Sequence, residues 1–302
     1  MKKRIYLLII ILLSFATIIG FAEIYLRYVG LGDPIVYDRN YVYGYAPKIN
    51  QKKKRLNESI VSINDVGLRS IENWKDKKNY KKIIFYGDSV TYGGSYIDDK
   101  ETFVYLACNK FKNTNFLCGN AGVNSYGIHN IIYRAKYDKR IKDPDFKVFI
   151  VVPDDFYRGL QNSQTAHFYL NEKKFILPAI FEAVNFIATK YDLNNYISKL
   201  DDTRIDDNKI DLINETIKFI KSEFSSYDEK EEKYLTFYIH PKKKTKISNY
   251  IFKNLKKDID IIDTSLELHK KHYHDTIHLN KIGHKIFSNL IYEKLNNRIK
   301  KN

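Results

Sequence analysis

Short apolar runs alternate along the chain with longer stretches in which apolar residues recur at helical spacing. The apolar runs predict five strands: Lys82–Tyr86, Asn115–Cys118, Val148–Val152, Tyr234–Ile239 and Ile259–Ile262. The helical spacing predicts helices at Thr102–Phe111, at Ile128–Arg140 and before Asn297. Apolar strands separated by helices are typical of a parallel sheet covered on both faces. The pattern therefore predicts an α/β fold, a three-layer α/β/α arrangement around a central, mostly parallel five-stranded sheet.

The longest apolar run lies at the N-terminus, where three basic residues precede the uncharged residues 5–22. At about 1.5 Å per residue, such a helix crosses most of a bilayer core. The basic residues favour a cytoplasmic N-terminus. We therefore expect residues 1–27 to be a single-pass transmembrane anchor in the cell membrane, with the rest of the chain on the periplasmic or extracellular side. The small residues Gly20 and Ala22 leave cleavage as a signal peptide open.

The remaining chain divides into two parts. Residues 28–79 are polar and interrupted by glycine and proline, which predicts an extended lead-in segment. Residues 80–302 carry the strand–helix alternation and form the expected α/β domain. Residues 156–230 interrupt that alternation with mixed helical and polar segments, which we interpret as an insertion beside the sheet.

Composition narrows the class of protein. Apolar residues make up 44% of the chain, so it can bury a core and is not a disordered chain. The net charge of +15 would suit an anionic partner, but the basic residues are scattered and match no nucleic-acid-binding motif. We therefore expect no nucleic-acid partner. The only two cysteines, Cys108 and Cys118, exclude a disulfide scaffold. In an exported chain, a disulfide and two free thiols both remain open.

Candidate chemistry follows the first predicted strand and precedes the last helix. Ligands of open parallel sheets bind outside the carboxyl ends of the strands. There, Ser89 lies in a strand-to-helix turn that would expose its hydroxyl near backbone N–H groups, as a nucleophile requires. Asp275 and His278 are three residues apart, so the carboxylate can orient the imidazole as a general base.

Three segments together carry a family resemblance: GDSVTYGG at 87–94, NAGVNSYG at 120–127 and DTIHLNKIGH at 275–284. They resemble the SGNH (GDSL) hydrolase superfamily over roughly residues 80–298. The resemblance implies a flavodoxin-like SGNH hydrolase fold. It also implies that Ser89 is the nucleophile, His278 the base and Asp275 its orienting carboxylate. With the anchor and residues 30–70, the chain is similar to membrane-anchored bacterial members linked to surface glycans.

Two positions depart from the family pattern at the oxyanion site, to which the N–H of Ser89 would also donate. Ser125 stands where the family usually has glycine, and it keeps the backbone N–H. Asp154 stands where an asparagine side chain usually donates, and an ionised carboxylate cannot donate. Three outcomes remain open: burial keeps Asp154 protonated, Asn120 or Asn124 supplies the donor, or the rate falls by roughly 10²–10³.

Several other residues allow rival interpretations. The histidines that cluster near Asp275 are His269, His272, His274 and His278. Their spacing matches no zinc-protease motif, so we expect no metal and no cofactor, and we interpret His269 and His272 as solvated loop residues. His240 could line the pocket or end a strand. Arg158 could contact substrate or form a surface ion pair.

Serine, histidine and aspartate in these roles imply acyl transfer through an acyl-enzyme. If water is the acceptor, the protein is an esterase that removes an ester, most simply O-acetyl, from a carbohydrate or surface glycan. This is the function that we expect. The alternative is a glycan O-acetyltransferase, which would need a membrane partner as acyl donor. A second alternative is a non-catalytic glycan-binding or scaffold protein, which the aspartate at 154 favours.

Overall fold

The centre of the structure is a five-stranded sheet with the strand order β6-β5-β7-β8-β9. Its strands are β5 (Lys81–Gly87), β6 (Phe116–Gly122), β7 (Phe146–Val151), β8 (Tyr234–Tyr238) and β9 (Ile261–Asp263). All neighbouring strands are parallel. This computed structural model describes residues 2–75, 77, 79–111, 115–141, 144–162, 178–185, 187–188, 207–229 and 233–300.

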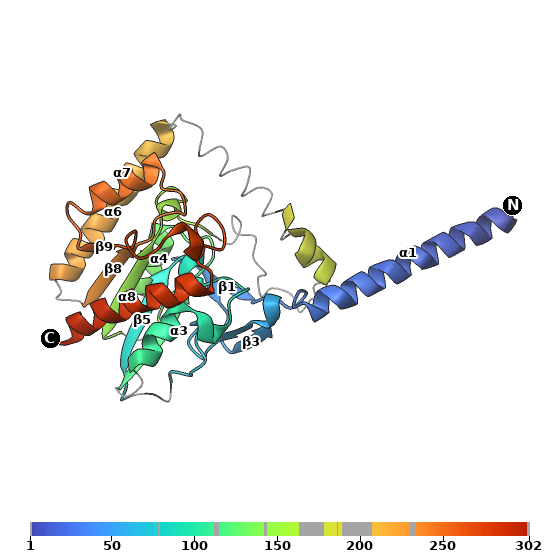
Figure 1. Cartoon of the computed structure of the whole chain (residues 1–302), viewed down its shortest axis with the longest axis horizontal. Coiled ribbons are helices and arrows are strands. Elements are labelled where there is room, and N and C mark those ends of the chain that lie inside the picture. Colours follow the sequence, from blue (N-terminus) through green and yellow to red (C-terminus); the bar gives the residue numbers. More distant parts are fainter. Residues whose placement is uncertain are drawn as a thin grey trace.

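Helices cover both faces of the sheet (Figure 1). One face packs against α4 (Ile128–Tyr137), α6 (Asp207–Glu229) and α7 (Lys246–Leu255). The other packs against α3 (Phe103–Cys108) and α8 (Lys281–Lys300). Neighbouring residues of a strand therefore enter different cores, which explains why the strands are apolar throughout. The predicted three-layer α/β fold is confirmed.

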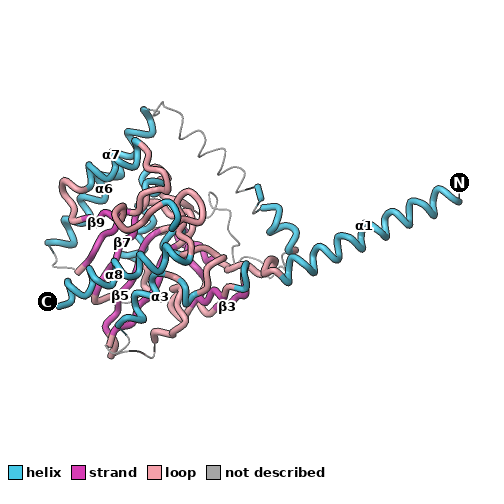
Figure 2. The backbone as a smooth tube through the Cα atoms, in the orientation of Figure 1, coloured by secondary structure: helices cyan, strands magenta, loops and turns pink. Residues whose placement is uncertain are grey.

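The remaining short elements lie in the connections (Figure 2). Helix α2 (Ser89–Tyr92) follows β5 directly. The 3₁₀ helices are Leu56–Glu58, Asp99–Glu101, Asn109–Phe111, Pro153–Phe156 and Lys270–His272.

The segment predicted as an insertion contains part of the main fold. Ile217, Ile220 and Phe224 of α6 are buried in the core against the sheet. Helix α6 is thus the covering helix between β7 and β8, and the mixed apolar pattern of 207–229 reflects one buried face. Residues 163–177 and 189–206 of the predicted insertion lie outside the described residues.

Residues 28–79 are more ordered than the extended lead-in that the sequence predicts. They contain two antiparallel pairs, β1 (Tyr37–Asn40) with β2 (Gly44–Pro47) and β3 (Gln51–Lys54) with β4 (Ile60–Ile63). Aromatic and branched side chains of these strands join the core of the α/β domain. The N–H of Arg69 donates to the carbonyl of Asn120 at 2.8 Å, which attaches the segment to edge strand β6. The strands are too short to show a clear sequence period.

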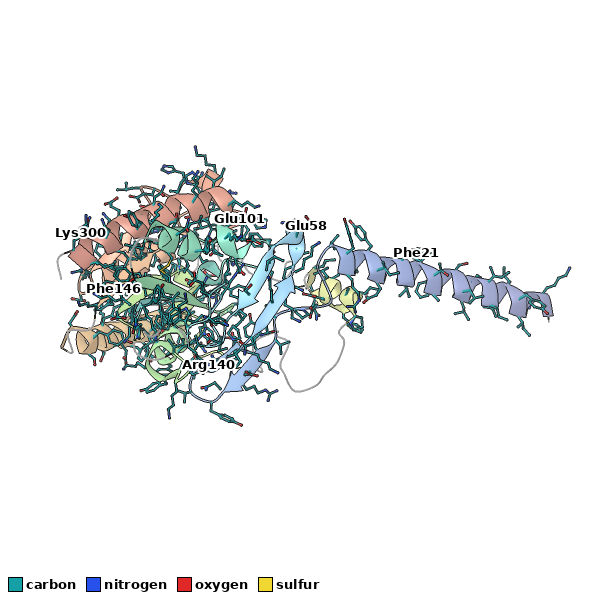
Figure 3. All side chains as sticks on the ribbon, turned by 90° about the horizontal axis from the view of Figure 1, so that it is seen from below. Phe21, Glu58, Glu101, Arg140, Phe146 and Lys300 are labelled. Carbon is teal, nitrogen blue, oxygen red and sulfur yellow. A yellow bond between two sulfur atoms is a disulfide. The ribbon has the colours of Figure 1, made fainter. Side chains whose placement is uncertain are left out.

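Helix α1 (Lys2–Tyr28) projects away from the domain (Figure 3). Its most apolar stretch of 18 residues has a mean hydropathy of 2.7 and is not buried by the rest of the chain, so α1 is long and apolar enough to cross a membrane. The last turns of α1 contact the domain through Glu23, whose carboxylate accepts the N–H groups of Ala179 and Ile180 at 2.9 and 3.1 Å. The short helix that begins there is joined to the domain by a buried ion pair between Glu182 and Arg55.

Cys108 and Cys118 form a disulfide that links the end of α3 to β6, with 5.8 Å between the Cα atoms. The structure thereby decides between the two states that the sequence left open.

Candidate active site

Ser89 lies where the sequence predicts it, at the turn between β5 and helix α2. The Asp88 side chain caps this helix by accepting the N–H of Val90 at 2.8 Å. Helix α2 packs closely on the strand ends: a Cβ on Gly122 would lie 2.2 Å from the N atom of Tyr92. This close packing holds the Ser89 hydroxyl in one place at the carboxyl end of the sheet.

His278 and Asp275 lie in the loop before α8, and the structure brings both to Ser89. The Nε2 atom of His278 is 2.8 Å from Ser89 Oγ. Its Nδ1 atom is 2.8 Å from Asp275 Oδ2. The other oxygen of Asp275 accepts the N–H groups of Ile277 and His278 at 2.9 and 2.8 Å. These four contacts fix the positions of the Asp275 carboxylate and the His278 imidazole relative to the Ser89 hydroxyl.

The electrostatics of this pair suit a general base. Burial lowers the pKa of His278, but the hydrogen bond and charge of Asp275 outweigh that effect and raise it above the usual value. Burial raises the pKa of Asp275, but its bonds to His278 and to backbone N–H groups hold it well below the usual range. Asp275 therefore stays ionised and fixes the Nδ1–H tautomer, which leaves Nε2 free to accept the serine proton.

The predicted oxyanion donors lie at the ends of β5 and β6. Ser89 is the first residue of helix α2, so its N–H has no hydrogen-bond acceptor within the helix. Ser125 is exposed and has φ of +61°, the left-handed conformation that glycine adopts most readily. This conformation is consistent with the glycine that the SGNH pattern usually has at this position. Asn124 is half-buried. The side-chain amide of Asn120 is already occupied: its nitrogen donates to the carbonyls of Thr91 and Tyr92 at 2.7 and 3.4 Å, and its oxygen accepts the N–H of Gly122.

Asp154 acts as an acceptor in this structure. It receives the hydroxyl of Tyr157 at 2.5 Å and a guanidinium N–H of Arg158 at 3.4 Å. Its side chain is 25% exposed. We therefore correct the expectation that Asp154 stands in for a donating asparagine.

Sequence reasoning missed the network around Arg158. This guanidinium lies 3.1 Å from Asp88 Oδ2 and 3.3 Å from Asp155 Oδ1, and it donates to the carbonyl of Tyr126 at 3.0 Å. It thus joins the loops that follow β5, β6 and β7 and is not a simple surface ion pair. Burial and the nearby Asp88 raise the pKa of Asp155 well above its usual value. The sequence offered one signal of this network: Asp154 and Asp155 precede Arg158 by four and three residues.

The histidine cluster does not assemble as a metal site. No group of three or more metal-ligating side chains occurs among the described residues. His272 is buried, contrary to the expected solvated position, because its Nδ1 atom accepts the N–H of His269 in a tight 3₁₀ turn. His274 stacks on Tyr96 at 4.3 Å. A buried histidine that sequence reasoning left without a role, His284, accepts the N–H of Phe103, and burial lowers its pKa to about 3.

Comparisons with known proteins add distant structural likeness. No model of a protein family matches the chain, and no curated protein matches it. Several solved structures resemble it. The acetyl xylan esterase AlAXEase is 17% identical, with a TM-score of 0.43, over 70% of this chain and 98% of its own. An acetylxylan esterase from Geobacillus stearothermophilus is 13% identical, with a TM-score of 0.44, over 70% and 93%.

A lipase/acylhydrolase from Enterococcus faecalis is 13% identical, with a TM-score of 0.41, over 72% of this chain and 96% of its own. These identities and TM-scores are low. The fold assignment therefore rests on the strand order and the layers, and the chemistry on the geometry around Ser89.

Proposed function

We propose that this protein is a serine esterase that hydrolyses an ester, most simply O-acetyl, of a carbohydrate or surface glycan. The observation that carries the proposal is the unbroken chain of contacts from Ser89 Oγ through His278 to Asp275, each 2.8 Å long. A buried structural serine would not need an oriented imidazole whose free nitrogen points at its hydroxyl.

The reaction would proceed in two balanced steps. His278 Nε2 takes the proton of Ser89 as Oγ attacks the acyl carbonyl, and the resulting tetrahedral oxyanion collapses to an acyl-enzyme. The leaving sugar alkoxide receives the proton from His278. Water then attacks the acyl-enzyme, gives a proton to His278, and releases the carboxylic acid as Ser89 recovers its hydrogen.

For the oxyanion we propose the backbone N–H groups of Ser89 and Ser125 as donors, with the side chain of Asn124 as a third. We leave out Asp154 because it accepts from two donors already. Without that third donor, kcat would be lower by roughly 10²–10³.

We further propose that α1 remains as a membrane anchor and that the α/β domain lies outside the cytoplasm. Two observations support this placement. Three basic residues precede the apolar helix, which favours a cytoplasmic N-terminus. The disulfide between Cys108 and Cys118 is typical of oxidising, extracytoplasmic compartments.

The test is covalent labelling of the full chain in detergent with a fluorophosphonate, followed by intact mass. One adduct is expected on the wild-type protein and none on Ser89→Ala or His278→Ala. The matched control is Ser225→Ala, which removes an exposed hydroxyl on α6 and should label normally. Labelling that survives Ser89→Ala would refute the assignment, and a folded wild-type protein without adduct would favour a non-catalytic glycan binder.

The acyl acceptor is tested separately. Acetylated xylan is incubated with unlabelled protein from a preparation that reacts with the fluorophosphonate. The amount of acetate released is compared with the amount of acetyl groups transferred to added sugar. Acetate alone supports the esterase, whereas transfer to a sugar hydroxyl would assign the O-acetyltransferase instead, with a membrane partner as its acyl donor.

A further inference from the structure

Beside the proposed active site is an open, strongly basic hollow with a volume of about 670 Å³. It lies beyond the carboxyl ends of β8 and β9. Five lysines line it: Lys242, Lys243, Lys244, Lys270 and Lys271. Among the described residues, its lining contains no aspartate or glutamate.

Within the described ranges, four of the five lysines of this hollow have no carboxylate beside them. Lys242, Lys244, Lys270 and Lys271 are exposed, and none has a carboxylate partner within the part of the chain that the structure describes. Like charges gathered on one concave surface create a positive potential that attracts anions. The chain has many lysines, but here two separate segments bring theirs to one concave surface.

A second observation also points to a ligand. His240 lines the same hollow and is only 3% exposed. Burial lowers the pKa of His240, so the ring is neutral and carries one N–H donor. Its Nε2 atom lies 3.3 Å from Asp263 Oδ1, which can accept that N–H. The Nδ1 atom is then a buried acceptor without a partner among the described residues, which is costly, and a hydroxyl group of a bound glycan would satisfy it.

The hollow shares a wall with the loop that carries the catalytic candidates. The N–H of Lys242 donates at 2.7 Å to the carbonyl of Thr276, the residue after Asp275. The hydroxyl of Tyr273 donates at 2.8 Å to the carbonyl of His240. The strand order places β7 between β5 and β8. At about 4.8 Å per strand, the ends of β5 and β8 are therefore about 10 Å apart.

We propose that this hollow is a subsite for an anionic group, a carboxylate or a phosphodiester, of a glycan whose ester lies at Ser89. The inference rests on the proposed function for the part of the ligand at the serine. A separation of about 10 Å requires an extended ligand, because one small ester could not reach both places. The substrate class is therefore an acidic oligosaccharide or polymer and not a neutral one.

The experiment measures direct binding, which does not depend on turnover. Full chain in neutral detergent is titrated with three probes: de-esterified oligogalacturonate, oligomeric poly(glycerol phosphate) and neutral xylo-oligosaccharide. Lys244→Gln with Lys271→Gln removes two positive charges from the hollow. The matched control, Lys253→Gln with Lys257→Gln, removes two exposed charges from the end of α7 and the residues after it.

We expect one acidic probe to bind in preference to the neutral one, and its identity distinguishes carboxylate from phosphodiester. The Kd for that probe should rise about tenfold in the variant of the hollow and less than about twofold in the control. Binding should weaken with added salt, as screening predicts. An equal loss in both double variants would show that net charge alone is responsible and would overturn the proposal. Failure of both acidic probes to bind would overturn it too.

Failure of the proposed function has a different signature. Binding of an acidic probe in the hollow without labelling at Ser89 would support the subsite and refute the esterase. Labelling at Ser89 without binding of either acidic probe would support the esterase and refute the subsite.

Discussion

Replacing Arg158 with methionine should reveal the repulsion stored among the carboxylates at the strand ends. The substitution keeps most of the side-chain volume but removes the only cation that contacts both Asp88 and Asp155 in the described structure. The Asp88 side chain is 1% exposed and that of Asp155 is 0% exposed, so water cannot replace the guanidinium there. Breaking a buried pair costs about 3–5 kcal/mol. Arg158 itself is 23% exposed, so we expect a loss of about 3 kcal/mol in the free energy of unfolding.

The pH dependence gives this prediction its sign. The pKa of Asp155 in the folded state lies above its ordinary value, so its stability contribution is complete at low pH and falls as pH rises through that pKa. Removing Arg158 raises this pKa further, and the deficit of the variant should therefore be larger at pH 8 than at pH 5.

The assay is urea unfolding followed by the fluorescence of Trp74, the single tryptophan, which is buried. The control is Arg298→Met, which breaks an ion pair with Asp260 whose side chains are 47% and 71% exposed. Exposed pairs contribute less than about 1 kcal/mol, so this variant should change little at either pH. A deficit for Arg158→Met below about 1 kcal/mol, or one that is the same at pH 5 and pH 8, would refute the reasoning.

Three further predictions concern other parts of the molecule. Asp275→Asn should lower kcat by about 10⁴ and move the acid limb of the rate profile to lower pH, because Asp275 raises the pKa of the base His278; an unchanged limb would contradict this. Cys108→Ser with Cys118→Ser, which opens a loop with a sequence separation of 10, should cost about 3 kcal/mol in urea unfolding, and the wild-type protein with reductant should lose the same amount. Arg69→Met removes a buried guanidinium from its carboxylate partner and from three backbone carbonyls, and should destabilise the fold by about 3–5 kcal/mol; a loss below about 1 kcal/mol would show that the ion pair is replaceable.

The sheet was predictable because its strands have a strong local signal. Strands β5 and β7 are buried on both faces, so every residue in their centres is apolar. The lead-in was not predictable in the same way: Tyr45 and Val61 are fully buried, but they lie in four-residue strands whose partners are set by tertiary packing.

The candidate site shows the same division. The pairing of Asp275 with His278 follows from a spacing of three residues, and the motif order indicates Ser89. The role of Asp154 could not be read from alignment with a motif, because it depends on Arg158 and Tyr157 reaching back to it. Asp88 looked like a motif residue only, and its burial beside Asp155 emerges when the ends of two strands meet.

The contact between Glu23 and residues 179–180 fastens the last turns of α1 to the part of the chain that follows β7. Helix α1 has 27 residues, or about 40 Å, which exceeds a hydrocarbon core by about 10 Å. With its last turns fastened to the domain, an embedded α1 would hold the domain at a set height and tilt. Ser89 would then contact only esters in a thin layer parallel to the bilayer. Esters farther from the membrane would reach it only when their own polymer chains move inward.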